Sequence, residues 1–197
     1  MAQQSTFLEE LMAAGRGVVS LLIGDRKAGS YFDFSRRGLV GSFIALALAR
    51  ALAASLPMML GPTTPGIVTR SIVFDVLLLV LEVACSAIAL RQMQRLDGMV
   101  PYLVADNWAT FFLTLIAAAL AAAGVSDQLT AIVLVVVAIL IEVNIARVVV
   151  GLSPLQIAIF LIAQLVGASI AVLLFGQIFP ASDLAAQLGA AASSAAQ

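Results

Sequence analysis

Five runs of mostly apolar residues, each about twenty residues long, dominate this chain of 197 residues. A helix of that length rises about 30 Å, which matches the hydrocarbon thickness of a bilayer. Hydrophobic residues make up 62% of the chain and charged residues 11%, whereas soluble domains carry roughly 25% charged residues. The sequence therefore predicts an all-α integral membrane protein, a bundle of five transmembrane helices surrounded by lipid.

Turn and capping residues set the expected domain organisation. Residues 1–37 are an amphipathic and juxtamembrane segment, residues 38–180 the five-helix transmembrane domain, and residues 181–197 a C-terminal tail rich in small residues. Gly, Pro and Ser residues separate the expected spans and fit helix ends. The spans are expected at about 38–60, 67–90, 98–124, 127–150 and 154–179, and Pro180 is expected to close the last one.

The N-terminal segment predicts an amphipathic helix over residues 6–23. Thr6 and Glu9 form a T-x-x-E capping box. Apolar side chains recur at helical spacing on one face: Phe7, Leu8, Leu11, Met12, Val18, Val19 and Leu22. Such a helix either lies in the membrane interface or packs against the ends of the spans, and the pattern favours neither.

The cations indicate an orientation. Five of the ten Lys and Arg residues precede the first span, Arg91 and Arg95 lie between the second and third spans, and Arg147 lies near the exit of the fourth. On the opposite side only Arg70 breaks the pattern. The positive-inside rule then predicts a cytoplasmic N-terminus and a C-terminus on the other side of the membrane.

Several ionisable and amide side chains lie well inside the apolar runs. An isolated charge at mid-depth costs at least ~2.5 kcal/mol on insertion scales, so such residues persist where they pair inside a bundle or serve a polar pathway. With the spans in alternating directions, Glu82, Asp106 and Glu142 reach a similar depth, whereas Arg50 lies somewhat deeper and Arg147 nearer the surface. The expected intramembrane polar layer consists of Arg50, Asp75, Glu82, Asp106, Asn107, Glu142, Asn144 and Arg147, with Gln164 as a further neutral partner.

Spacing indicates that these residues pair between helices. Asp75 and Glu82 are seven apart and share a face of the second span. Glu142 and Arg147 are five apart and are not neighbours on one helix. Three interpretations follow: interhelical pairs that fix helix register, a proton or solute path whose carboxylates change protonation, or a polar groove that receives another protein.

Small and aromatic residues complete the packing expectations. Gly167 and Ala171 on the fifth span are spaced as a small-xxx-small pair, a pattern that favours close helix packing. Tyr102 and Trp108 lie near the cytoplasmic interface, where an aromatic belt is the favoured interpretation and a ligand contact the alternative.

Composition excludes several function classes. The chain has no His and a single Cys, Cys85, so one chain cannot assemble a zinc site, a haem ligand pair or a disulfide. The usual base for a Ser or Cys nucleophile is also missing. No basic stripe for nucleic acid and no nucleotide-binding or zinc-protease motif is present. We therefore expect a protein that is not an enzyme, with no cofactor, no metal and no nucleic-acid partner.

The order of a cytoplasmic amphipathic segment, five spans and a short outer tail resembles the Yip1-type membrane proteins. The fragments Tyr31-Phe32-Asp33-Phe34, 101–108 and Ala146-Arg147 are similar to small inner-membrane proteins of α-proteobacteria without an assigned function. The resemblance implies a multi-pass protein of a bacterial inner membrane with a periplasmic C-terminus. The D-L-x-G-P motif of eukaryotic Yip1 proteins is absent, so no site residue is carried over.

The expected function follows from these features. The main expectation is a non-enzymatic accessory, scaffolding or assembly protein of the bacterial inner membrane that acts through helix contacts. The main alternative is a proton- or ion-coupled small-solute transporter or channel subunit, with Glu82, Asp106 and Glu142 as carriers and Arg50 and Arg147 as counter-charges. An intramembrane enzyme comes third, because paired carboxylates alone could do acid-base work. The expected partners are the lipid bilayer and either further copies of the chain or other membrane proteins.

Overall fold

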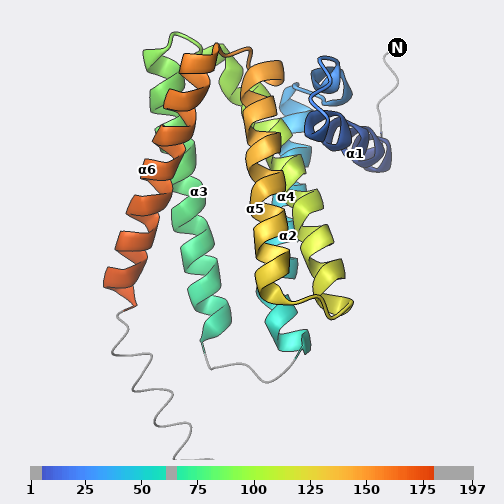
Figure 1. Ribbon diagram of the computed structural model, residues 1–197, viewed down its shortest axis with the longest axis vertical. Coiled ribbons are helices and arrows are strands. Elements are labelled where there is room, and N and C mark those ends of the chain that lie inside the picture. Colours follow the sequence, from blue (N-terminus) through green and yellow to red (C-terminus); the bar gives the residue numbers. More distant parts are fainter. Residues whose placement is uncertain (1–5, 61–65, 180–197) are drawn as a thin grey trace, which may run out of the picture.

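The computed structural model describes residues 6–60 and 66–179, and the regular elements in those ranges are all helical (Figure 1). This confirms the expected all-α bundle. Pro180 and the 181–197 tail lie outside the described residues. In chain order the elements are α1 (Phe7–Leu22), η1 (Ala28–Tyr31), α2 (Arg36–Leu60), α3 (Ile67–Gln92), η2 (Leu96–Gly98), α4 (Met99–Ala122), α5 (Asp127–Asn144), the π-helical turn η3 (Ile145–Val149) and α6 (Pro154–Ile178).

Five of the described helical segments are long and apolar enough to cross a membrane, so the chain is a multi-pass membrane protein. Their bounds are Arg36–Leu56, Ile67–Gln92, Leu96–Ala122, Asp127–Val149 and Pro154–Ile178. The main difference from expectation is at the end of the fourth span, where α5 gives way to η3. Such π-helical turns recur at functional sites, and the apolar pattern of the sequence does not reveal them.

The spans form two groups. α3 packs along α6, while α2 packs along α4 and α5 lies against α4 (Figure 1). The first group is α3 with α6, and the second is α2, α4 and α5. Contacts between the two groups are sparse: α2 and α4 each touch α3 over a short stretch only. The bundle is therefore split along its length.

The α3–α6 interface is built on small residues. Gly167 and Ala171 on α6 are both buried, as the small-xxx-small spacing predicts. A Cβ at Gly167 would lie 3.0 Å from the Leu81 carbonyl oxygen and 3.2 Å from Cys85 Sγ, both on α3. Without side chains at this point the two helices can approach closely, which in lipid replaces the hydrophobic effect as a driving force.

Helix α1 lies across one end of the bundle, against α4 and α5 (Figure 1). The Thr6–Glu9 capping box is formed, as expected. The face toward the bundle carries Ala14, Val18 and Leu21, all buried. Another face exposes apolar side chains: Leu8, Met12, Val19, Leu22 and Ile23. The expected packing against the ends of the spans thus describes one face of α1. A different face presents an apolar surface that suits the expected position in the membrane interface.

The expected aromatic belt is wrong for both residues that suggested it. Trp108 is only 1% exposed, because Phe112 of α4 stacks on its ring and the tilted ring of Phe7 of α1 lies beside it. Tyr102 is 5% exposed and packs edge to face against Phe160 of α6, with ring centroids 5.0 Å apart. α1 covers Trp108 at the level where the sequence suggested contact with lipid headgroups.

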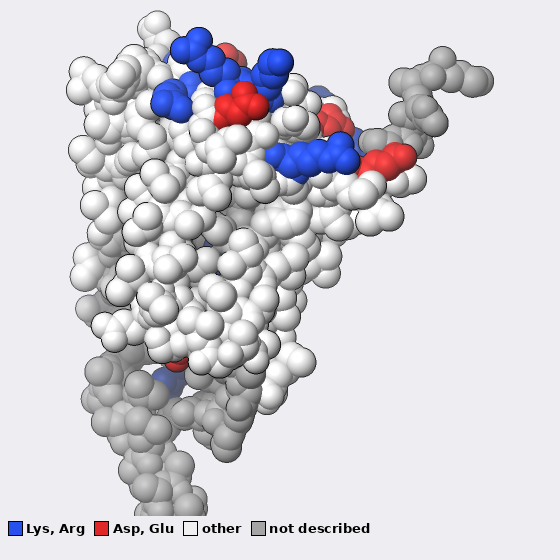
Figure 2. All heavy atoms as spheres, turned by 45° about the vertical axis from the view of Figure 1, so that its right-hand side comes forward, with Lys and Arg blue, Asp and Glu red and all other residues white. Residues whose placement is uncertain are grey.

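Charged side chains gather at one end of the molecule. Figure 2 shows Lys and Arg clustered at the end where α1 lies, with a broad uncharged surface below them. That end holds the N-terminal segment, the α3–α4 connection and the α5–α6 connection. Arg70 lies on α3 near the other end, with its guanidinium 5.4 Å from the centroid of the Phe179 ring.

Candidate functional site

An acidic cavity of about 570 Å³ lies between the two helix groups. This volume falls within the range of small-molecule sites, roughly 300–1,000 Å³. Each of the five spans contributes a polar side chain to its lining: Arg50 from α2, Glu82 from α3, Tyr102 and Asp106 from α4, Glu142 from α5 and Gln164 from α6. The cavity is therefore the point at which the whole bundle meets.

Gln164 links two of these groups. Its Nε2 donates to Glu142 Oε1 and to Tyr102 Oη, each at 2.6 Å. One amide thus ties α6 to both α4 and α5 across the gap between the helix groups. The burial of Tyr102 against Phe160 fixes its hydroxyl at the cavity wall.

In the described part of the chain, Glu82 and Asp106 lack the kind of hydrogen bond that Glu142 accepts from Gln164. Both are half-buried at the cavity wall. Within residues 6–60 and 66–179, neither makes an ion pair with a cation. They lie within electrostatic range of each other and of Arg50, and both also act on Glu142. Glu82 and Asp106 therefore share the influence of one guanidinium, and with Glu142 beside them the cavity has an acidic character.

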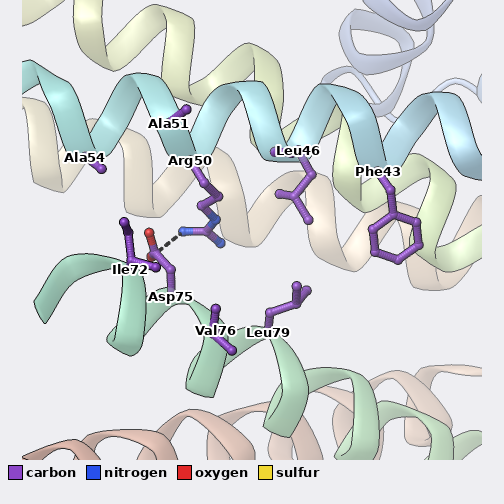
Figure 3. A pocket seen from close by; sticks show the side chains of 10 residues that line it. Phe43, Leu46, Arg50, Ala51, Ala54, Ile72, Asp75, Val76 and Leu79 are labelled. Carbon is purple, nitrogen blue, oxygen red and sulfur yellow. Dashed lines mark hydrogen bonds and ion pairs between the residues drawn. The ribbon is translucent and has the colours of Figure 1, made fainter. Parts of the chain in front are cut away.

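That guanidinium is already engaged. Arg50 Nη1 lies 3.0 Å from Asp75 Oδ1 and donates a hydrogen bond to it. Figure 3 shows Arg50 reaching from α2 toward Asp75 on α3. The pair lies in a second pocket of about 370 Å³ whose other walls are apolar, among them Phe43, Leu46 and Leu79.

The two pockets join. Leu46, Arg50 and Leu79 line both of them, so the acidic cavity continues into the apolar groove between α2 and α3. A ligand in this combined space would meet carboxylates at one end and aliphatic side chains at the other. That chemistry suits a cation that carries an apolar body.

Helical spacing explains the placement of these side chains. On α4, Tyr102, Asp106 and Thr110 recur every four residues and share the face that lines the cavity. On α5, Ala138 and Glu142 follow the same rule. The small side chain of Ala138 leaves space beside the carboxylate one turn away.

Three residues of the expected polar layer lie elsewhere. Asn107 is adjacent to Asp106 and so points to another face of α4, where its Nδ2 donates to Ser42 Oγ on α2 at 3.0 Å. Asn144 Nδ2 donates to the Leu21 carbonyl oxygen at 2.8 Å, and Arg147 Nη2 to the Gly24 carbonyl oxygen at 3.4 Å.

The single layer expected from depth alone is therefore divided. Arg50, Glu82, Asp106 and Glu142 surround the acidic cavity, and Asp75 pairs with Arg50 at its edge. Asn107 joins α2 to α4, and the two residues of the α5–η3 segment hold the end of α1. Depth along a span gives the level of a side chain but not the direction in which it points.

Sequence reasoning assigned Tyr102 to the lipid interface and so missed its place in the cavity. The signal was its position one helical turn before Asp106, which puts both on one face of α4. Gln164 was expected as a neutral partner of the polar residues, and it holds that position.

The arrangement constrains what the cavity can bind. Among the described residues, no group of three His, Cys, Asp or Glu side chains is placed to hold a metal ion. The carboxylates, the amide and the phenol can instead accept protons or hydrogen bonds from a larger cation. Comparisons with protein-family models, with curated proteins and with solved structures found no match for this chain.

Proposed function

We propose that this multi-pass membrane protein is a non-enzymatic subunit of a proton-coupled transporter for a small organic cation. The observation that carries the proposal is the acidic cavity, in which Glu82, Asp106 and Glu142 face a shared space while Arg50 is paired with Asp75. Carboxylates that only fixed helix register would be expected to pair one to one with cations or donors; Glu142 does so with Gln164, whereas Glu82 and Asp106 have no such partner among the described residues.

Charge balance suggests how such a cavity would work. Several ionised carboxylates close together in a low-dielectric environment are costly, so the cavity favours occupation by protons or by a cation. Binding of the organic cation would then displace protons, and protonation would release the cation. Exchange of one for the other couples the solute to the proton gradient without any covalent step.

The split between the helix groups supports an oligomeric form of this transporter. Five spans make a thin bundle, and the acidic cavity lies where α2 and α4 contact α3 sparsely. A second copy placed along the split would separate the cavity from lipid. The transporter is therefore proposed to act as a homo-oligomer.

The cationic end sets the proposed orientation. Lys and Arg side chains gather at the end that carries α1 (Figure 2). By the positive-inside rule this end faces the cytoplasm. Together with the resemblance in layout to bacterial membrane proteins, this supports placement in a bacterial inner membrane, with the C-terminus in the periplasm.

An accessory or assembly role is the second candidate. It is favoured by the exposed groove between α2 and α3, whose apolar walls fit a transmembrane helix of another protein. In that case Arg50 and Asp75 would contact polar groups of the partner helix, and the carboxylates of the acidic cavity would stabilise the assembled complex.

Flux measurements distinguish the transporter role from the accessory role. The protein would be reconstituted in liposomes with an imposed pH gradient, and tetraphenylphosphonium uptake and internal pH would be followed together. We expect the wild type to exchange the cation for protons, and Glu82→Gln, Asp106→Asn and Glu142→Gln to abolish exchange while the protein stays folded. Asp97→Asn is the matched control, because this carboxylate is 78% exposed outside the cavity.

A wild type without transport activity would contradict the transporter role. If the wild type moves neither protons nor organic cations, and the three cavity substitutions lower thermal stability instead, the transporter proposal fails. Recovery of a defined complex with another membrane protein in mild detergent would then support the accessory role.

A further inference from the structure

We infer that Arg26 and Arg147 form a binding site for the phosphate group of an anionic phospholipid. Their side chains line one pocket of about 570 Å³ at the cationic end, together with Gly24 and Val148. Arg26 comes from the connection after α1, and Arg147 comes from η3. Both arginines are exposed, and among the described residues no acidic side chain lines this pocket, so its charge is positive and suits an anion. The planar fork of Arg matches phosphate oxygens in geometry and charge.

The position of Arg147 is fixed by the protein itself. Its Nη2 donates to the Gly24 carbonyl oxygen at 3.4 Å. Gly24 has a positive φ of 71°, and a Cβ there would lie 2.8 Å from Arg147 Nη2. Glycine therefore both ends α1 and admits the guanidinium. Asn144 holds the same end of α1 through the Leu21 carbonyl, so the Arg147 half of the site is organised before a ligand arrives.

Most donors of Arg147 stay available for a ligand. A guanidinium has five N–H donors, and the bond to Gly24 uses one. Nearby Asp25 does not line the pocket, and its Oδ1 accepts a hydrogen bond from the Lys27 amide at 3.0 Å.

Neighbouring apolar residues point to a lipid as the source of the phosphate. Leu22 and Ile23, directly before Gly24, are 41% and 74% exposed. Arg147 lies two residues before the end of the fourth span at Val149, about 3 Å along the helix and thus at headgroup level. A phospholipid can place its phosphate between the guanidiniums and its acyl chains along the exposed apolar face of α1.

Such a site goes beyond solute transport and does not depend on it. Its ligand joins the α1–η1 connection to the end of the fourth span, two segments distant in the sequence. A bound anionic lipid would therefore stabilise the docking of α1 on the bundle.

The test is a lipid-dependent thermal shift on the full chain in dodecyl maltoside. We expect dioleoylphosphatidylglycerol to raise the unfolding midpoint by about 5 to 10 °C near saturation, the range expected for a ligand at ~100 times its Kd. Dioleoylphosphatidylcholine and inorganic phosphate should leave the midpoint unchanged. Native mass spectrometry should detect one retained phosphatidylglycerol.

Charge-matched variants locate the site. Arg26→Gln and Arg147→Gln should each abolish the shift and the retained lipid, whereas Arg91→Gln should preserve both, because Arg91 is exposed at the same end but does not line the pocket. Arg26→Gln leaves the Arg147–Gly24 hydrogen bond in place, so it decides the question even if Arg147→Gln fails to fold.

Each alternative outcome overturns the proposal. Equal loss of the shift in Arg91→Gln would mean that lipid acts through general electrostatics. Protection by inorganic phosphate at comparable concentration would identify a free-phosphate site. An unchanged shift in Arg26→Gln would exclude this pocket.

Discussion

Arg50 Nη1 lies 3.0 Å from Asp75 Oδ1 and links α2 to α3, two helices that touch each other sparsely. The pair spans the split between the helix groups and lies at the edge of the acidic cavity (Figure 3). It therefore joins the two groups at this level and keeps one guanidinium within electrostatic range of two further carboxylates, Glu82 and Asp106.

Removal of one partner of this pair should cost more than removal of both. Arg50→Met leaves the Asp75 carboxylate unpaired within the span, whereas Arg50→Met/Asp75→Leu leaves no unpaired charge there. We expect a coupling energy of about 0.6 to 1.7 kcal/mol, from the average to the maximum found for polar contacts between membrane helices. Unfolding in mixed detergent micelles measures it, and strict additivity of the single substitutions would show that the contact contributes nothing.

The α3–α6 interface should tolerate no added side chain at its narrowest point. A Cβ alone at position 167 would lie within 3.2 Å of the Leu81 carbonyl and of Cys85 Sγ. Gly167→Val adds two methyl groups beyond that Cβ. We expect a loss of about 1 to 3 kcal/mol in the free energy of unfolding from overpacking. Gly176→Val on the same helix is the control, because a Cβ there meets nothing within 4 Å. Equal effects of both substitutions would point to helix propensity alone.

The docking of α1 should weaken as pH rises. Glu10 is 9% exposed, and its Oε1 has no hydrogen-bond partner among the described residues. Burial raises the pKa of this carboxyl above its ordinary 4.5, Asp33 raises the pKa further, and Arg37 partly opposes them. The folded state thus holds the proton more tightly than the unfolded state. Stability is greatest below pH 4.5 and falls as pH rises from there through the raised pKa.

Hydrogen exchange of the α1 amides measures this dependence. Glu10→Gln should remove the fall with pH and increase protection at neutral pH about fivefold, equivalent to ~1 kcal/mol. Asp97→Asn should change neither, because Asp97 lies exposed and away from α1. A pH profile identical in Glu10→Gln and the wild type would assign the dependence to other carboxyls.

The proposed orientation can be read by cysteine labelling in intact bacterial cells. With Cys85→Ala as background, Ser30→Cys in η1 and Gln128→Cys near the start of α5 place one exposed thiol at each end of the bundle. We expect a membrane-impermeant maleimide to label Gln128→Cys and to reach Ser30→Cys only after lysis. Labelling in the opposite order would invert the orientation.

Local patterns predicted the elements of this fold well. The capping box of α1, the five apolar helices and the small pair Gly167 and Ala171 all follow from short-range spacing, and all are present. These features depend on contacts within one helix or on the need of each helix for one close-packed face.

The grouping of the polar residues could be predicted only in part. Depth placed Glu82, Asp106 and Glu142 at one level, but it did not give the rotation of each helix. That rotation depends on which spans pair. The α3–α6 pairing is a tertiary contact in which Gly167 lies against Leu81 and Cys85 of α3, and the pattern within one helix does not reveal it. Trp108 was misassigned for a similar reason, since its cover comes from Phe7 on α1.

The separation of α3 and α6 from the other spans has a mechanical consequence. Both described connections between the groups, η2 and the stretch from Val150 to Ser153, lie at the cationic end. At that end the chain itself joins the α3–α6 pair to the other spans. Further along the described helices side-chain contacts join the two groups, among them the Gln164 bridge and the Arg50–Asp75 pair, so replacing either contact loosens the groups from each other without unwinding a helical turn.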